Sequence, residues 1–175
     1  FLRCSTPLGC VTFFSAMVAF LQCAAFGKTY IPQMNDTTTA RASVDLKASA
    51  EKVWDALTDP AKIKQYLFGT DTECDWRVGS RIYYRGEWEG KHYEDKGEIL
   101  EIEFAKKIVM TYWSGFSGLA DIPENYHRIT YRLETIPAGT RLSVVQENHR
   151  DEATRDHSAA NWKLVLEGLR KLVEV

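Results

Sequence analysis

The chain has 175 residues, of which 45% are hydrophobic and 26% charged, a composition typical of one globular domain with a single core. Its formal net charge of -2 and its pI near 6.1 argue against a nucleic-acid-binding protein, which would carry a basic stripe. The densest basic clusters are pairs such as Lys106-Lys107. We therefore expect no nucleic-acid partner.

The first part of the chain differs in composition from the rest. No charged residue occurs between Arg3 and Lys28, and the apolar run ends in the small residues CAA. This outline is typical of a secretory signal peptide or a short membrane anchor. Two other interpretations remain: Met34 is the natural start and the preceding residues are an upstream extension, or the run is a structural helix.

We predict that residues 1–36 stay outside the fold and that residues 37–175 form the domain. If Met34 is the start, Cys74 is the only cysteine and the protein needs no oxidising compartment. The predicted location is then cytoplasmic, or exported if residues 1–25 are a true signal segment.

Two short helices are expected after a first strand in RASVDLKA, where apolar and polar residues alternate. Ser49 is predicted to cap the first helix. Asp59 is predicted to cap the second, with Pro60 at its first position, where a missing N–H costs nothing.

The pattern then changes to a period of two, which indicates six consecutive strands joined by short turns. The predicted strand segments are TECDWRV, SRIYYRGEW, YEDKGEILEIEF, KKIVMTYW, YHRITYRLETI and TRLSVVQENH. The register between Gly97 and Ile102 is left open, because Ile99, Leu100 and Ile102 are all apolar, a pattern that a bulge would produce. The loop at residues 113–126 is either a lid or a plain variable connection.

The last segment, from about Ala153 to Val175, returns to helical spacing, with Trp162, Leu166 and Leu169 on its apolar face. The predicted fold is therefore α+β: a curved antiparallel seven-stranded sheet wrapped around a long C-terminal helix, with two short helices after the first strand. One helix cannot fill such a sheet everywhere, so a cavity between them is expected.

A family resemblance rests on the runs AEKVWDALTDPAKIKQYL, DWRVGSRIYYRG, KGEILEIEFAKKIVMTYW, GTRLSVVQENH and HSAANWKLVLEGLRKLVEV. In order and spacing they resemble the START-like (SRPBCC) helix-grip superfamily, in the branch related to the C-terminal domain of the activator of heat-shock protein 90 ATPase. The matched positions are mostly core and turn residues, so the resemblance implies the fold more than a function. Asn161 departs from it, since many relatives have Gly there.

The sequence contains no metal-binding or phosphate-binding motif, and we predict neither metal nor cofactor. The alternation of residues predicts that a set of aromatic, apolar and amide side chains, including Asn148, faces the concave side of the sheet. The predicted ligand-binding residues are Tyr84, Trp88, Met110, Tyr112, His127, Ile129, Tyr131, Gln146, Trp162 and Leu166. His127 would be a polar group in an apolar cavity or a satisfied histidine at its mouth.

We predict that the domain binds a small hydrophobic or amphipathic molecule and has no stable membrane association. The first alternative is an enzyme of the same fold, in which His127 and a cavity tyrosine transfer protons on an aromatic or polyketide-like compound. The second alternative, implied only by the resemblance, is a chaperone-interaction module. The predicted outward residues show ordinary mixed charge: Arg81, Arg85, Glu101, Lys107, Arg128 and Arg132.

Overall fold

The computed structural model describes residues 38–175, so the prediction for residues 1–36 lies outside the described part of the chain. Within residues 38–175, no helix combines the length and the apolar character that crossing a membrane requires.

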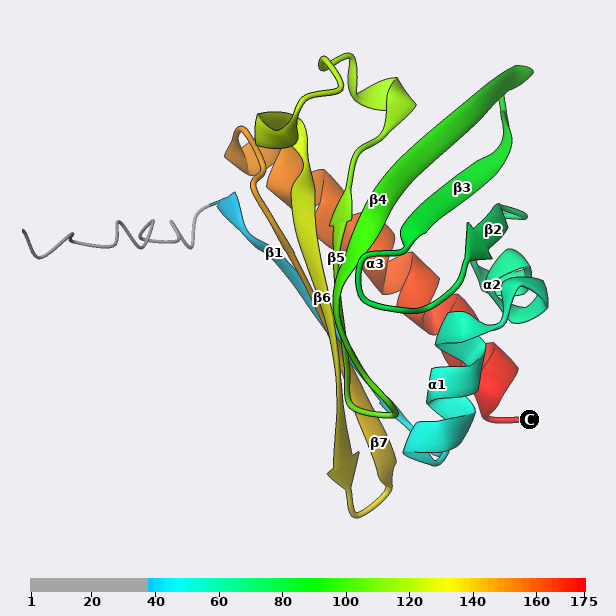
Figure 1. The fold of residues 1–175 in the computed structure, drawn as a ribbon. Coiled ribbons are helices and arrows are strands. Elements are labelled where there is room, and N and C mark those ends of the chain that lie inside the picture. Colours follow the sequence, from blue (N-terminus) through cyan, green and yellow to red (C-terminus); the bar gives the residue numbers. More distant parts are fainter. Residues whose placement is uncertain (1–37) are drawn as a thin grey trace, which may run out of the picture. The chain divides into compact units, whose positions relative to one another are not determined.

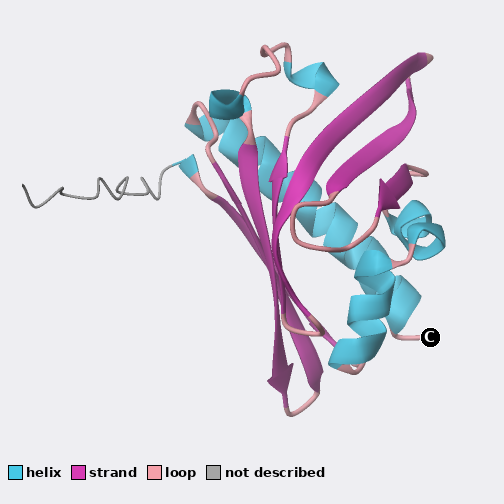
Figure 2. Ribbon diagram, viewed as in Figure 1, coloured by secondary structure: helices cyan, strands magenta, loops and turns pink. Residues whose placement is uncertain are grey.

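The described chain begins with one strand, continues with two short helices and a series of six strands, and ends with one long helix (Figure 2). In chain order the elements are β1 (Ala40–Leu46), α1 (Ala50–Thr58), α2 (Pro60–Tyr66), β2 (Asp71–Cys74), β3 (Arg81–Trp88), β4 (Lys91–Glu103), β5 (Lys107–Tyr112), the 3-10 turns η2 (Gly115–Ser117) and η3 (Pro123–Asn125), β6 (His127–Ile136), β7 (Gly139–Glu147) and α3 (Glu152–Val173). The predicted order of elements is confirmed.

All seven strands form one antiparallel sheet in the order β1-β7-β6-β5-β4-β3-β2. The meander from β2 to β7 uses short connections except for the longer loop at residues 113–126, and β1 completes it by pairing with β7. The sheet curves around α3, and α1 and α2 lie at one end of that helix (Figure 1). This is the predicted helix-grip architecture.

The caps of the two short helices are those predicted from the sequence. The side chain of Ser49 accepts a hydrogen bond from the amide of Lys52 at the start of α1. Asp59 ends α1 and starts α2, where its carboxylate accepts from the amide of Ala61 and Pro60 takes the first position. The chain therefore breaks between α1 and α2 without leaving the first amides of α2 unpaired.

A bulge in β4 decides which side chains enter the core. Ile99 pairs with Met110 of β5, whereas the next pair is Glu101 with Val109, so Leu100 is the extra residue. The shift keeps Glu101 on the outer face and returns Ile102 to the inner one, opposite Ile108. The bulge that the apolar run indicated is present.

The strand predicted in TECDWRV is shorter than expected. β2 ends at Cys74, and Trp76 has a φ of 53°, in the left-handed region that a strand does not use. Trp76 thus leaves the sheet edge and packs partly buried against the core.

The core lies between the concave face of the sheet, the short helices and α3. Its most buried large side chains are Leu46, Val53, Ile82, Ile99, Ile108, Ile129, Leu142, Val144 and Leu169. They come from nearly every element, so the sheet and the helices are held together by one shared apolar cluster.

Gly97 marks the closest approach of β4 and β5. A Cβ atom at this position would overlap with the carbonyl oxygen of Thr111 and would also touch Ile82. The neighbouring residue Glu98 donates its amide to the hydroxyl of Thr111, which holds the two strands at this spacing.

We expect Gly97→Ala to lower the free energy of unfolding by about 2 kcal/mol or more, because backbone must move to admit the methyl group. Urea unfolding followed by far-UV circular dichroism measures this. Gly115→Ala is the matched control, since its Cβ would lie 3.4 Å from the carbonyl oxygen of Glu94, an ordinary contact. Equal unfolding midpoints for the two variants would contradict the close-approach explanation.

Two histidines pack together where β6 begins and β7 ends. The ring centroids of His127 and His149 lie 4.8 Å apart. Nδ1 of His127 donates to the carbonyl of Glu147 at 2.9 Å, and Nδ1 of His149 donates to the carbonyl of Thr38 at 3.0 Å. The pair thereby ties Thr38, two residues before β1, to the end of β7.

Burial lowers the pKa of His127 and of His149 below the ordinary value of 6.5, while their backbone hydrogen bonds oppose this shift. The Nε2 atom of His149 is buried and lacks a hydrogen-bond partner within residues 38–175, so a proton there would place an uncompensated charge in the interior.

We expect the free energy of unfolding to fall as the pH drops below about 6.5, because the unfolded chain binds protons there before the folded chain does. The double variant His127→Gln with His149→Gln should flatten this part of the pH dependence in urea unfolding between about pH 7.5 and 5.5. His92→Gln, in the exposed β3–β4 hairpin, is the control and should leave the slope unchanged. A double variant with the wild-type slope would refute the assignment.

Candidate functional site

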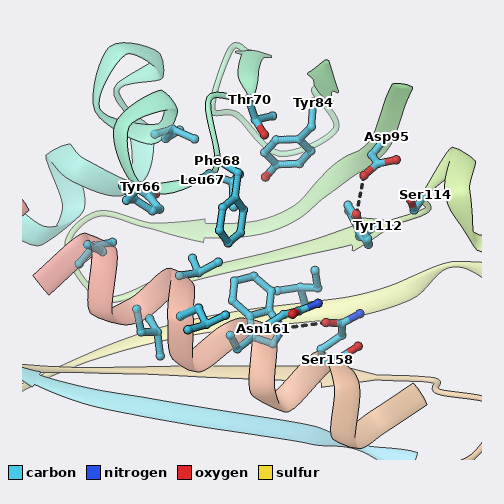
Figure 3. Close-up of a pocket in the computed structure, with 18 of the residues that line it drawn as sticks. Tyr66, Leu67, Phe68, Thr70, Tyr84, Asp95, Tyr112, Ser114, Ser158 and Asn161 are labelled. Atoms are coloured by element: carbon cyan, nitrogen blue, oxygen red, sulfur yellow. Dashed lines mark hydrogen bonds between the residues drawn. The ribbon is translucent and has the colours of Figure 1, made fainter. Parts of the chain in front are cut away.

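A cavity of about 690 Å³ lies between the concave face of the sheet, α2 and α3. Figure 3 shows side chains from these elements converging on it, with Tyr66 and Phe68 on one side and Ser158 and Asn161 on the helix. The α3 residues that line the cavity run from His157 to Leu169, whereas Val173, near the end of the helix, is buried in the core outside it.

Aromatic side chains make up much of the cavity wall. They are Tyr66, Phe68, Trp76, Tyr84, Trp88, Tyr93, Tyr112, Phe116, Tyr131 and Trp162. Aliphatic residues such as Ile108, Ile129 and Leu166 fill the floor between them. A concave, largely apolar wall with a few polar groups is typical of a small-molecule site.

Nine of the ten residues predicted for the site line this cavity. They are Tyr84, Trp88, Met110, Tyr112, Ile129, Tyr131, Gln146, Trp162 and Leu166. Their role in binding a ligand stays a prediction, but the alternation that placed them on one face holds across four strands and α3.

His127 is the exception, since it does not line the cavity. It lies on the inner face, but at the first residue of β6, beyond the cavity wall and against His149. Asn148 also departs from the expected inward direction. Its φ of 71° turns the chain after β7, and its amide donates to the carbonyls of Glu124 and Tyr126 instead.

One side of the cavity is held by a contact between α3 and β7. The indole Nε1 of Trp162 donates to Oε1 of Gln146 at 2.7 Å, and the Trp162 ring meets Tyr131 edge to face at 5.7 Å. Gln146 is buried, so this bond satisfies an amide that would otherwise cost free energy in the interior.

The opposite side carries three polar residues on neighbouring strands. Tyr84 of β3 pairs directly with Asp95 of β4, and the Tyr112 hydroxyl of β5 donates to Oδ2 of Asp95 at 2.6 Å (Figure 3). The amide of Gly115 donates to Oδ1 at 3.0 Å. Asp95 is buried, and the rings of Tyr84 and Tyr112 lie 6.3 Å apart.

The cavity tyrosines hold their protons firmly. Burial raises the pKa of Tyr66, Tyr84 and Tyr131 well above the ordinary value, and it does the same for Tyr112, where the negative charge of Asp95 adds to the effect. At neutral pH these hydroxyls are hydrogen-bond donors and acceptors rather than bases.

Sequence reasoning missed several lining residues, and Asp95 is the most important. Asp95 alternates with polar neighbours in YEDKG and looks like an outward residue of a hairpin. Its pairing with Tyr84, a predicted inward residue, would have revealed its direction once the β3–β4 register was known. Phe68 and Trp76 were missed because both have positive φ values outside regular elements.

Side-chain contacts fix the loop at residues 113–126 to the rest of the domain. Lys96 forms an ion pair with Asp121, and the Tyr126 hydroxyl donates to Asp121 at 2.7 Å. Phe116 of η2 reaches the cavity and packs against Tyr93 at 5.5 Å. One end of this loop is therefore part of the cavity wall.

Within residues 38–175, no three or more His, Cys, Asp or Glu side chains come close enough to hold a metal ion. The functional groups that line the described cavity are aromatic rings, hydroxyls, amides, carboxylates and the imidazole of His157.

Comparison with known proteins gives the same fold from several sources. ChR145 from Cytophaga hutchinsonii has a solution structure that is 41% identical in sequence, covers 78% of this chain and 93% of its own, and superposes with a TM-score of 0.69. For CV1439 from Chromobacterium violaceum, the values are 26%, 79%, 98% and 0.66. The Aha1 dimer from Colwellia psychrerythraea, at 21% identity, 78% and 96% coverage and a TM-score of 0.62, shares the fold.

No curated protein matches the chain. The family model described as "Activator of Hsp90 ATPase homolog 1-like protein" matches residues 47–174, which is most of the chain. The resemblance seen in the sequence is confirmed, and the chain belongs to the Activator of Hsp90 ATPase homolog 1-like family, with the helix-grip fold of the START-like superfamily.

Proposed function

We propose that the protein binds a small hydrophobic or amphipathic molecule in the cavity between the sheet and α3. The observation that carries this proposal is the cavity itself: its volume of about 690 Å³ lies in the range of small-molecule sites, and its wall is mainly aromatic. Interiors are normally packed without voids of this size, so an empty cavity would sacrifice packing contacts.

Exposed apolar residues around the cavity support the same proposal. Phe68, Trp88, Phe116 and Leu164 line the cavity and yet keep more than half of their surface in solvent, at 63%, 58%, 51% and 63% exposed. Residues that combine these two properties lie where the cavity opens. An apolar rim is costly in water and is typical of a surface that an apolar ligand crosses or contacts.

A second supporting feature is an unpaired donor in the wall. The indole Nε1 of Trp76 is buried and finds no hydrogen-bond partner within residues 38–175. Buried polar atoms normally have partners, and a carbonyl or hydroxyl of a bound molecule would supply one.

The acid-base alternative receives less support. The proposed pair of His127 and a cavity tyrosine is not formed, because His127 bonds to the Glu147 carbonyl and the Tyr112 hydroxyl bonds to Asp95. The raised pKa of the cavity tyrosines also removes them as bases near neutral pH.

The chaperone-interaction alternative rests on the name of the family model. It requires a contact patch on the outer face of the sheet, where ion pairs such as Arg85 with Glu73 and Glu94, and Lys107 with Glu101, cover the strands instead. Four of the exposed large apolar side chains, Phe68, Trp88, Phe116 and Leu164, line the cavity.

The proposal is tested with N-phenyl-1-naphthylamine, a neutral aromatic probe whose fluorescence rises in an apolar site. We expect saturable binding to the full chain. Ser158→Trp places a large ring in the cavity from α3 and should weaken the binding at least about tenfold, since it removes the space that the probe needs.

Lys163→Trp is the matched control, because it adds the same ring to an exposed position of α3 outside the cavity wall. It should bind the probe as the wild type does. Failure of the wild type to bind, or equal weakening by both variants, would overturn the proposal.

A further inference from the structure

The charges in the cavity wall have one sign. Two carboxylates, Glu87 and Asp95, line the cavity, whereas no lysine or arginine of the described chain does so. The one histidine in the wall is His157 on α3. Its Nε2 lies 3.1 Å from the side-chain nitrogen Nδ2 of Asn161. A cavity that binds fatty acids or other anions would need a basic group at the polar end of the ligand.

Asp95 is the carboxylate that determines which charge the cavity favours in a ligand, because only 8% of its surface is exposed, whereas Glu87 is exposed. Its partners are the Tyr112 hydroxyl and the Gly115 amide, which are both neutral. Within residues 38–175 it has no ion pair with a lysine or arginine. The charge of Asp95 is therefore stabilised by hydrogen bonds but not neutralised by a cation.

Asp95 also keeps room for a further donor. A carboxylate has about four acceptor positions on its two oxygens. The two hydrogen bonds occupy one position on each oxygen. Because Asp95 lines the cavity, the remaining acceptor positions can receive a hydrogen bond from a donor group of a ligand.

Aromatic rings surround this carboxylate. Tyr84 lies directly opposite Asp95 on β3, and Tyr112 lies next to it on β5, with their rings 6.3 Å apart. Tyr93 and Phe116 form a second ring pair on the same side, at 5.5 Å. The faces of such rings attract cations, and the attraction is larger where water is excluded.

We propose that the ligand of this cavity carries an amino group or other organic cation on an apolar body, with the cation hydrogen-bonded to Asp95 beside the rings of Tyr84 and Tyr112. This inference rests on the proposed function and adds a chemical class to it. The same groups disfavour a ligand with a carboxylate or phosphate, because its charge would face Asp95 with no lysine or arginine in the wall to offset it.

A matched series of compounds tests the charge preference. 1-Naphthylmethylamine, 1-naphthylmethanol and 1-naphthoate share one ring system and differ in a cationic, neutral or anionic end. Each is titrated as a competitor against bound N-phenyl-1-naphthylamine on the full wild-type chain. We expect the amine to bind at least tenfold more tightly than the alcohol, and the naphthoate to bind more weakly than both.

Asp95→Asn removes the charge and keeps the shape of the side chain. It should reduce the affinity for the amine at least tenfold and leave the affinity for the alcohol within about threefold of the wild type. Glu94→Gln is the matched control, because it removes one carboxylate charge from the residue next to Asp95, at an exposed position outside the cavity wall. It should change the preference for the amine less than threefold.

Each outcome decides between the two proposals. Binding of the probe with equal displacement by amine and naphthoate, or with no displacement by the amine, overturns the charge preference and leaves the proposed function standing. That comparison needs only the wild type, so it remains decisive if Asp95→Asn does not fold. Absence of binding by the probe and by all three compounds overturns the proposed function, and the charge preference with it.

Discussion

The hydrogen bond between Trp162 of α3 and Gln146 of β7 sets the distance between helix and sheet on which the cavity depends. An indole ring standing between the two layers keeps them further apart than aliphatic packing would. On the C-terminal side of this contact, Leu166 and Leu169 belong to the core cluster and also line the cavity, and Val173 lies in the core outside it. On its N-terminal side, α3 contributes the short polar side chains of Ser158 and Asn161 to the wall. One helix thus serves both as core and as cavity wall.

The strands of the sheet contribute both to the core and to the cavity wall. Leu142 and Val144 of β7 are core residues, whereas Gln146 of the same strand lines the cavity. On β4, Asp95 and Ile99 share the inner face by alternation, so one strand places a carboxylate in the cavity and an apolar side chain in the core. The bulge at Leu100 then returns Ile102 to the inner face. Stability and binding therefore depend on the same strands.

Much of this arrangement was predictable from the sequence. Hydrophobic period, caps and turns gave the element order, because each of these signals acts locally: Ser49, Asp59 and Pro60 fix helix ends without reference to the rest of the chain. The inner face of the strands followed from alternation, which correctly grouped Tyr84, Met110, Tyr131 and Gln146. The family resemblance supplied the curvature that local signals do not contain.

The errors have a common physical origin, since they concern positions where the backbone departs from regular geometry or where direction depends on a partner strand. Trp76 and Asn148 have positive φ values, so alternation could not be extended through them. The inward direction of Asp95 could be predicted only from the β3–β4 register. The position of His127 beyond the cavity depends on the length of the cavity, which is a tertiary property. Of these residues, Asp95 and Trp76 contribute polar groups to the cavity wall.

Ligand binding between the sheet and α3 is measured directly by the response of the five tryptophan indole N–H signals in a two-dimensional ¹H–¹⁵N spectrum to N-phenyl-1-naphthylamine. Trp76, Trp88 and Trp162 line the cavity, whereas Trp54 and Trp113 do not. We expect the first three signals to shift together and saturate while the other two stay in place. Shifts of Trp54 and Trp113 equal to the rest, or no shift in any of the five at concentrations that saturate the fluorescence, would contradict a ligand between the sheet and α3.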